Sequence, residues 1–147
     1  MLSELKYAGI NQNDLITIYK LFIRSVAEYC SSVYHTSLTQ QQIKKIELIQ
    51  STSLKIILGN EYIDYTSSLR KFSLSTLCER RGERLERFSL KCVQDKFNKS
   101  LFPLNTNVKN REYFKVNFAR TTKYFNSTVP QCQRLLNDYA KNHPELF

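Results

Sequence analysis

Glycine and proline, the residues that most often shape tight turns, occur only three times each in the 147 residues of this chain. A fold built from many short strands needs more turns than these residues supply, whereas a helical fold does not. Hydrophobic residues make up 41% of the chain, and a chain of this length can bury roughly 70% of its unfolded surface. The sequence therefore predicts an all-α protein with a core of ordinary size.

Apolar residues recur at spacings of three and four in the first quarter of the chain, which predicts a helix from Asn13-Asp14 to about Val33. We expect one broad buried stripe on this helix, formed by Leu15, Ile18, Tyr19, Phe22, Ile23, Val26, Tyr29, Cys30 and Val33. Thr39 and Gln42 then have the spacing of a capping box, and Gly59 is a typical C-terminal residue of a helix. A second helix, antiparallel to the first, is predicted between them.

Two further helices are predicted before residue 98. Asp64 is a candidate N-cap for a short helix over residues 65–72. Thr76 and Glu79 form another potential capping box at the start of a longer helix that continues to about Phe97. Residues 1–98 are therefore expected to form a small bundle of three to four helices.

No period is sustained from Lys99 to Asn126, so we expect an irregular strap that lies over the helices. Val129-Pro130 then resembles a helix entry, because proline in the first turn loses no required hydrogen bond. A short C-terminal helix over residues 131–140 is predicted. Residues 99–147 thus form a basic, aromatic extension that packs on the helical domain of residues 1–98.

The formal net charge is +9, and its distribution is uneven. Residues 1–98 hold 14 Lys and Arg against 10 Asp and Glu, whereas residues 99–147 hold 8 against 3. A basic excess concentrated in one segment indicates a polyanionic partner. RNA or DNA is favoured over a membrane, because no continuous basic amphipathic helix accompanies the excess.

The fourth predicted helix carries one stripe of cations with spacings of four, three and four: Arg80, Arg84, Arg87 and Lys91. A phosphate backbone could follow such a stripe. The alternative is a solvated face stabilised by pairs such as Glu83 with Arg87. Arg81 points about 100° away from the stripe, toward the interior, where a helix end or a carboxylate could accept its hydrogen bonds.

A second candidate binding segment lies in the extension, where five cations alternate with five aromatic residues: Lys109, Arg111, Lys115, Arg120 and Lys123 with Tyr113, Phe114, Phe118, Tyr124 and Phe125. Cations can neutralise phosphates while aromatic rings stack on unpaired bases. The alternative is that the aromatic rings fix the strap to the helices and the cations stay in water. Both interpretations remain open at this point.

Catalytic, metal-binding and secretory signals are absent from the sequence. Neither His35 nor His143 has a nucleophile at a diagnostic spacing, no glycine-rich phosphate loop occurs, and the aspartates are not paired. The four cysteines lie far apart, so we expect neither zinc binding nor disulfides. With no signal peptide or long apolar run, an intracellular protein of the cytoplasm or nucleus is expected, without cofactor, small-molecule substrate or membrane partner.

Several segments, taken in order, resemble the C-terminal thumb and post-thumb region of non-LTR, LINE-like or jockey-like retrotransposon reverse transcriptases. They are Tyr19–Cys30, Ile46–Gln50, Leu54–Gly59, Tyr62–Tyr65, Leu74–Arg81, Tyr113–Thr121, Asn126–Pro130 and Leu135–Asn137. Ser32 and Tyr34 stand where the family usually has proline and tryptophan.

This resemblance implies a helical, thumb-like region and an extension that help to hold template RNA and target DNA. The fingers, the palm, the active-site aspartates and any endonuclease would lie before Met1, so the chain would be non-catalytic by itself. RNA or single-stranded DNA, and the polymerase core of the same element, are the implied partners. A helical protein-interaction module and a decayed element without activity are the alternatives.

Overall fold

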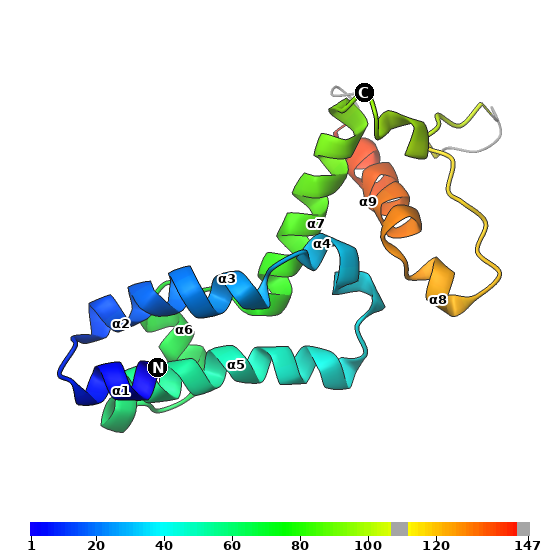
Figure 1. Ribbon diagram of the computed structural model, residues 1–147. Coiled ribbons are helices and arrows are strands. Elements are labelled where there is room, and N and C mark those ends of the chain that lie inside the picture. The colour runs from blue at the N-terminus through cyan, green and yellow to red at the C-terminus, as the bar shows by residue number, and fades with distance from the viewer. Residues whose placement is uncertain (107–111, 144–147) are drawn as a thin grey trace. The chain divides into compact units, whose positions relative to one another are not determined.

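The computed structural model describes residues 1–106 and 112–143, and Figure 1 shows their helices. The all-α prediction is confirmed, because these residues form no strand and only one isolated antiparallel bridge, between Leu104 and Phe114. The predicted number of three to four helices was wrong. The chain forms more and shorter helices, labelled α1 to α9.

The chain divides into two compact units. The first unit comprises Met1–Tyr29 and Thr39–Arg80, and the second comprises Cys30–Leu38 and Arg81–Phe147. The predicted ranges of 1–98 and 99–147 divide the chain at another position. The physical reason is helix α7, Leu77–Gln94, whose later turns share a core with the residues of the predicted extension.

The first unit is built on the long helix α5, beside which α1 and α2 lie in Figure 1. Its elements are α1 (Leu2–Tyr7), α2 (Gln12–Ile18), a π-helical turn (Tyr19–Ile23), α3 (Arg24–Ala27), α5 (Gln40–Leu58), a 3-10 turn (Gly59–Glu61) and α6 (Tyr65–Lys71). Its core consists of fully or almost fully buried side chains from these elements, including Leu2, Leu15, Tyr19, Leu54, Ile57 and Leu69.

The helix starts predicted from the capping residues Thr39, Asp64 and Thr76 are confirmed, whereas the start predicted at Asn13-Asp14 is wrong, because α2 begins at Gln12 with Asn11 as its N-cap. The Thr39 hydroxyl accepts a hydrogen bond from Gln42 N at 3.3 Å, and Gln42 Oε1 accepts one from Thr39 N at 2.8 Å. Asp64 caps α6 by accepting from Ser67 N at 3.0 Å. Each cap satisfies backbone N–H groups that have no partner within the helix.

The start of α7 has the same reciprocal cap. The Thr76 hydroxyl accepts from Glu79 N at 3.1 Å, and the Glu79 carboxylate accepts from Thr76 N at 3.0 Å. The end of α5 also agrees with the prediction, because Gly59 there has a φ of +59°, a conformation that costs glycine little.

The predicted helix from residue 14 to residue 33 is interrupted, and part of its expected buried stripe is exposed. Phe22, Val26 and Tyr29 keep 60%, 77% and 75% of their surface in contact with solvent. A π-helical turn at Tyr19–Ile23 contains an extra residue and rotates the side chains that follow it away from the preceding stripe. Cys30 then ends the helical path with a φ of +51°.

A buried polar network joins four elements of the first unit. Gln50, which is 0% exposed, accepts a hydrogen bond from the Tyr19 hydroxyl at 2.6 Å and donates to Tyr65 Oη and Ser75 O at 3.0 Å each. Burial raises the pKa of the Tyr19 phenol well above its usual value.

The Glu47 carboxylate accepts from the N–H groups of Leu77 and Cys78 at 3.1 and 3.0 Å. A carboxylate at the positive end of the α7 dipole is stabilising, so this network fixes where α7 begins.

The second unit places α7 and α9 side by side in Figure 1, with the strap along the other side of α9. Its elements are α4 (Ser31–Tyr34), a 3-10 turn (His35–Ser37), the later part of α7, a 3-10 turn (Lys99–Leu101), α8 (Thr122–Phe125) and α9 (Thr128–Asn142). Its core contains Leu85, Cys92, Phe102, Phe114, Cys132 and Leu136. The thiols of Cys92 and Cys132 are buried, as expected for small apolar residues, whereas Cys30 is exposed.

Two buried amides on α9 hold the strap. Asn137 Oδ1 accepts from Phe114 N at 2.7 Å, and Asn137 Nδ2 donates to Phe114 O at 2.9 Å. Four residues earlier, Gln133 Oε1 accepts from Asn117 N at 2.8 Å, and Gln133 Nε2 donates to Leu101 O at 2.8 Å. The irregular strap therefore satisfies part of its backbone through side chains rather than through a sheet.

Candidate nucleic-acid interface

The cationic stripe predicted on α7 is only partly available to a ligand. Arg84, Arg87 and Lys91 are exposed and belong to the second unit. Glu83 lies 4.0 Å from Arg87, but both side chains are largely exposed, so this pair holds Arg87 weakly. Arg80 differs, because it belongs to the first unit and its Nε lies 2.5 Å from Oε1 of Glu28, a carboxylate that is 1% exposed. Arg80 thus neutralises a buried charge of the first unit.

Arg81 lies in the interior, as its position on the helix predicts. It is 0% exposed, and none of its three guanidinium nitrogens has a hydrogen-bond partner, which differs from the predicted helix end or carboxylate. His35 Nδ1 and Thr36 Oγ1, in the same unit, are also buried without a partner. Burial and the positive charge of Arg81 lower the pKa of His35, which is half-buried.

The strap presents exposed cations at Lys115 and Arg120, and the adjoining helix α8 presents another at Lys123. No ion pair joins these three side chains to an acid within the ranges that the structure describes. The other two predicted cations of this segment, Lys109 and Arg111, lie outside the described residues. The exposed cations among those predicted as contacts therefore come from α7, the strap and α8, all in the second unit.

The aromatic residues of the strap divide between the core and the surface. Phe114 is 2% exposed and is part of the core of the second unit. Its ring is therefore not accessible to a base, and the prediction that Phe114 stacks on bases was wrong. Phe118 is 84% exposed, and Tyr113 and Tyr124 are 40% and 42% exposed. Phe125 is 48% exposed, but the Arg134 guanidinium covers one face of its ring at 3.8 Å. Different rings thus have the two predicted roles: Phe114 fixes the strap to the helices, and Phe118 is exposed to solvent.

The second unit carries most of the excess positive charge. It contains 13 Lys and Arg residues against six Asp and Glu residues, a formal excess of seven out of the +9 of the chain. The first unit contains nine basic and seven acidic residues. A surface with a basic excess attracts polyanions over a distance of about a Debye length, so the second unit is the attractive one.

Three further features bear on function. In residues 1–106 and 112–143, no three or more His, Cys, Asp or Glu side chains gather where they could hold a metal ion. None of the described helices has the length and apolar character needed to cross a membrane. No protein-family model, curated protein or solved structure matches the chain.

Sequence reasoning missed Gln133, Asn137 and Arg134 as organisers of this surface. All three lie on α9, where polar residues at spacings of three and four resemble a solvent-facing side. The available signal is that Gln133 and Asn137 are four residues apart and share one face of the helix with Pro130. Because the strap covers that face, the two amides are 0% and 3% exposed.

Proposed function

We propose that this chain binds RNA or single-stranded DNA through the second unit and has no catalytic activity of its own. The supporting observation is that exposed cations of α7 and exposed cations and rings of the strap and α8 belong to the unit with a formal excess of seven. The proposed contact residues are Arg84, Arg87, Lys91, Lys115, Arg120, Lys123, Tyr113, Phe118 and Tyr124. Phosphates would contact the cations, and unpaired bases would stack on the rings.

A single strand fits this arrangement better than a duplex. Stacking on Phe118, which is 84% exposed, requires a base whose face is not covered by its neighbours. Such stacking is sequence-tolerant, because every base has an aromatic face. The resemblance to retrotransposon reverse transcriptases supports the same proposal, since a thumb-like region and its extension would hold nucleic acid for a polymerase core. Arg80 is left out, because it already pairs with Glu28.

A second candidate function is protein interaction by the first unit. The observation that favours it is the exposed apolar row of Phe22, Val26 and Tyr29, which are 60%, 77% and 75% exposed and spaced by four and three residues. Clustered exposed apolar side chains often mark an interaction surface. By the resemblance, the partner would be the polymerase core.

The test of nucleic-acid binding is fluorescence anisotropy with a labelled ten-nucleotide RNA at several salt concentrations. For single strands, each neutralised phosphate changes the slope of log affinity against log salt by about −0.7. Replacing Arg84, Arg87 and Lys91 with Gln should therefore make the slope shallower by about 2, and replacing Lys115, Arg120 and Lys123 should also make it shallower.

The matched control is the triple variant Lys44→Gln, Lys45→Gln and Lys55→Gln, which removes the same charge from exposed positions of the first unit. The slope of this control should stay close to that of the unchanged protein. If all three triple variants lose affinity equally, binding depends on total charge alone and the proposed surface is incorrect. Absence of binding in dilute buffer would overturn the proposed function itself.

A further inference from the structure

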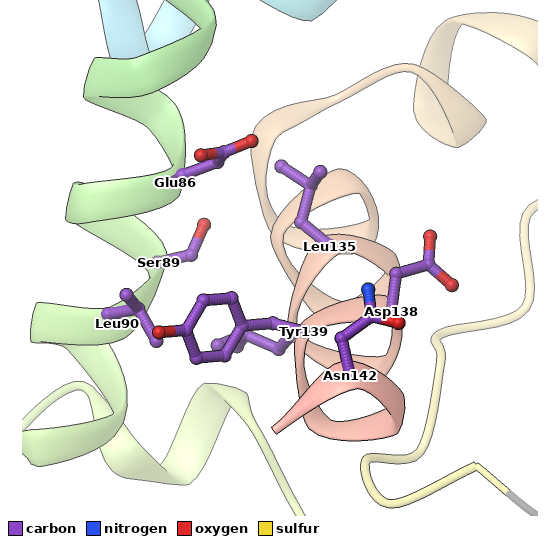
Figure 2. Close-up of a pocket in the computed structure, with 8 residues that line it drawn as sticks. Glu86, Ser89, Leu90, Leu135, Asp138, Tyr139 and Asn142 are labelled. Carbon is purple, nitrogen blue, oxygen red and sulfur yellow. The ribbon is translucent and has the colours of Figure 1, made fainter. Parts of the chain in front are cut away.

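A pocket of about 160 Å³ lies between α7 and α9, within the second unit. Figure 2 shows its lining: Glu86, Ser89 and Leu90 come from α7, and Leu135, Asp138, Tyr139 and Asn142 come from α9. Two of the lining residues, Ser89 and Leu136, are almost completely buried, and Ser89 Oγ already donates to Leu85 O at 2.8 Å. The lining therefore combines apolar side chains from both helices with polar groups, among which Glu86 and Asp138 are exposed.

The size of the pocket suits one six-membered ring. An apolar cavity of about 150 Å³ is large enough to bind benzene. Leu90 and Leu135 supply apolar walls, and the Tyr139 ring extends from α9 toward α7 in Figure 2. A single pyrimidine ring is the size of benzene, whereas the two fused rings of a purine need more room.

Glu86 determines which polar edge such a ring can present. Its side chain is exposed at the rim, points across toward Leu135 in Figure 2, and forms no hydrogen bond or ion pair with the described residues. A carboxylate only accepts hydrogen bonds, so it selects a ring that carries a donor. Cytosine carries the N4 amino group, and uracil carries the acceptor O4 at the same position.

One of the proposed phosphate contacts lies near the pocket wall. Arg87 precedes Leu90 by three residues, so the two side chains are neighbours on the surface of α7, whereas Lys91 points about 100° away from Leu90. On α9, Asp138 is a second carboxylate in the lining, and its Oδ1 lies 3.3 Å from Lys141 Nζ. A strand with a phosphate at Arg87 could thus turn one base inward.

We propose that this pocket takes one cytosine base of a bound single strand, with its N4 amino group donating to the Glu86 carboxylate and its ring lying against Tyr139 and the leucines. This inference rests on the proposed function and adds a base preference to contacts that are otherwise indifferent to sequence. Carboxylate recognition of the cytosine amino group should give roughly tenfold discrimination against uracil.

The experiment compares the affinities of labelled rC8, rU8 and rA8 for the full chain by anisotropy at one salt concentration. The unchanged protein should bind rC8 roughly tenfold more tightly than rU8 or rA8. Glu86→Gln should abolish the preference for rC8 over rU8, because an amide can also donate to uracil O4. Glu83→Gln is the matched control: it makes the same charge change one turn earlier on α7, outside the pocket, and should keep the preference.

The outcomes separate the inference from the function on which it rests. Equal binding of rC8 and rU8 with a salt dependence that follows the α7 cations would overturn the cytosine pocket and leave the proposed function standing. A preference for rC8 that survives in Glu86→Gln would also overturn it. Titration with free cytidine and uridine, followed by NMR of the Leu135 and Leu136 methyl groups, examines the pocket without phosphate contacts. Only cytidine should shift these signals, and failure of cytidine to shift them refutes the inference.

Discussion

Asn137 is expected to contribute strongly to the stability of the second unit, although it is a polar residue on an amphipathic helix. Its amide makes two hydrogen bonds to the backbone of Phe114, at 2.7 and 2.9 Å, and both residues are almost completely buried. Asn137→Ala removes both of these hydrogen bonds from buried backbone groups of Phe114. A buried group that loses its hydrogen-bond partner costs about 1–3 kcal/mol, so the variant should lose about 2–6 kcal/mol of unfolding free energy.

The size of this loss is what makes the prediction decisive. A domain is typically stable by about 5–15 kcal/mol, so one truncated amide should remove a large fraction of the total. Asn137→Asp should also destabilise the unit: the carboxylate can still accept from Phe114 N, but it cannot donate to Phe114 O and brings a charge into the core. Asn142→Ala, an exposed position on the same helix, should change stability by no more than about 0.5 kcal/mol.

The assay is urea unfolding followed by circular dichroism, combined with hydrogen exchange of the Phe114 amide. Asn137→Ala should lower the urea midpoint and expose the Phe114 amide to exchange, whereas Asn142→Ala should do neither. If Asn137→Ala unfolds at the same urea concentration as the unchanged protein and Phe114 stays protected, the two amide bonds do not hold the strap. The reasoning that links buried amides to the strap would then be refuted.

Two further predictions concern the second unit. Since burial and Arg81 lower the pKa of folded His35 while an unfolded histidine titrates near about 6.5, the unfolded chain binds the proton more readily. Stability should be fully present above that value and fall as the pH drops from about 7 to about 5. The urea midpoint of His35→Gln should not fall with pH in this range, whereas that of His143→Gln should still fall. If the midpoint of His35→Gln fell as much as that of the unchanged protein, His35 would not be the group responsible. Phe118→Ala should weaken RNA binding by about 1–3 kcal/mol without lowering the urea midpoint. Phe114→Ala should instead lower the free energy of unfolding by about 3–5 kcal/mol. If Phe118→Ala lowered the urea midpoint, the assignment of Phe118 to binding and Phe114 to the core would be contradicted.

Local signals in the sequence were sufficient to predict the starts of three helices, α5, α6 and α7. The caps at Thr39, Asp64 and Thr76 each depend on a partner three residues away, so the whole interaction is contained in a short stretch of sequence. The all-α class follows from apolar spacing and from the scarcity of turn residues, which are also local properties. These features could be predicted because they do not depend on distant parts of the chain.

The first long helix could not be predicted correctly, because its interruption has no local signal. The π-helical turn at Tyr19–Ile23 occurs in an apolar segment that fits an unbroken helix equally well. Tyr19 is 0% exposed and its hydroxyl bonds to Gln50, a residue 31 positions later. Packing against α5 therefore selects which side chains are buried. The short helix α1 was missed, because its six residues are too few for a period to be recognised.

Contacts between distant parts of the chain also decide which residues of the predicted interface are structural and which are exposed. Arg80, Arg84, Arg87 and Lys91 are equivalent by helical spacing, yet Glu28, 52 residues away from Arg80, makes that arginine structural. Among the aromatic residues, Phe114 and Phe118 are equivalent by composition, and the amide of Asn137 draws only the backbone of Phe114 into the core. Sequence periodicity identifies the elements of such a surface, but contacts between elements determine which of its side chains stay exposed.

The two groups of cations in the second unit should differ in affinity per charge because their backbones are held differently. Arg84, Arg87 and Lys91 stand on one continuous helix, whose hydrogen bonds fix their backbone before any ligand arrives. Lys115 and Arg120 stand on a strap with fewer backbone hydrogen bonds, including those from Lys115 N to Pro103 O and from Asn117 N to Gln133. Groups that are ordered in advance lose less conformational entropy on binding. Removing three charges from α7 should therefore reduce RNA affinity more than removing three from the strap and α8, even where the two salt slopes change equally.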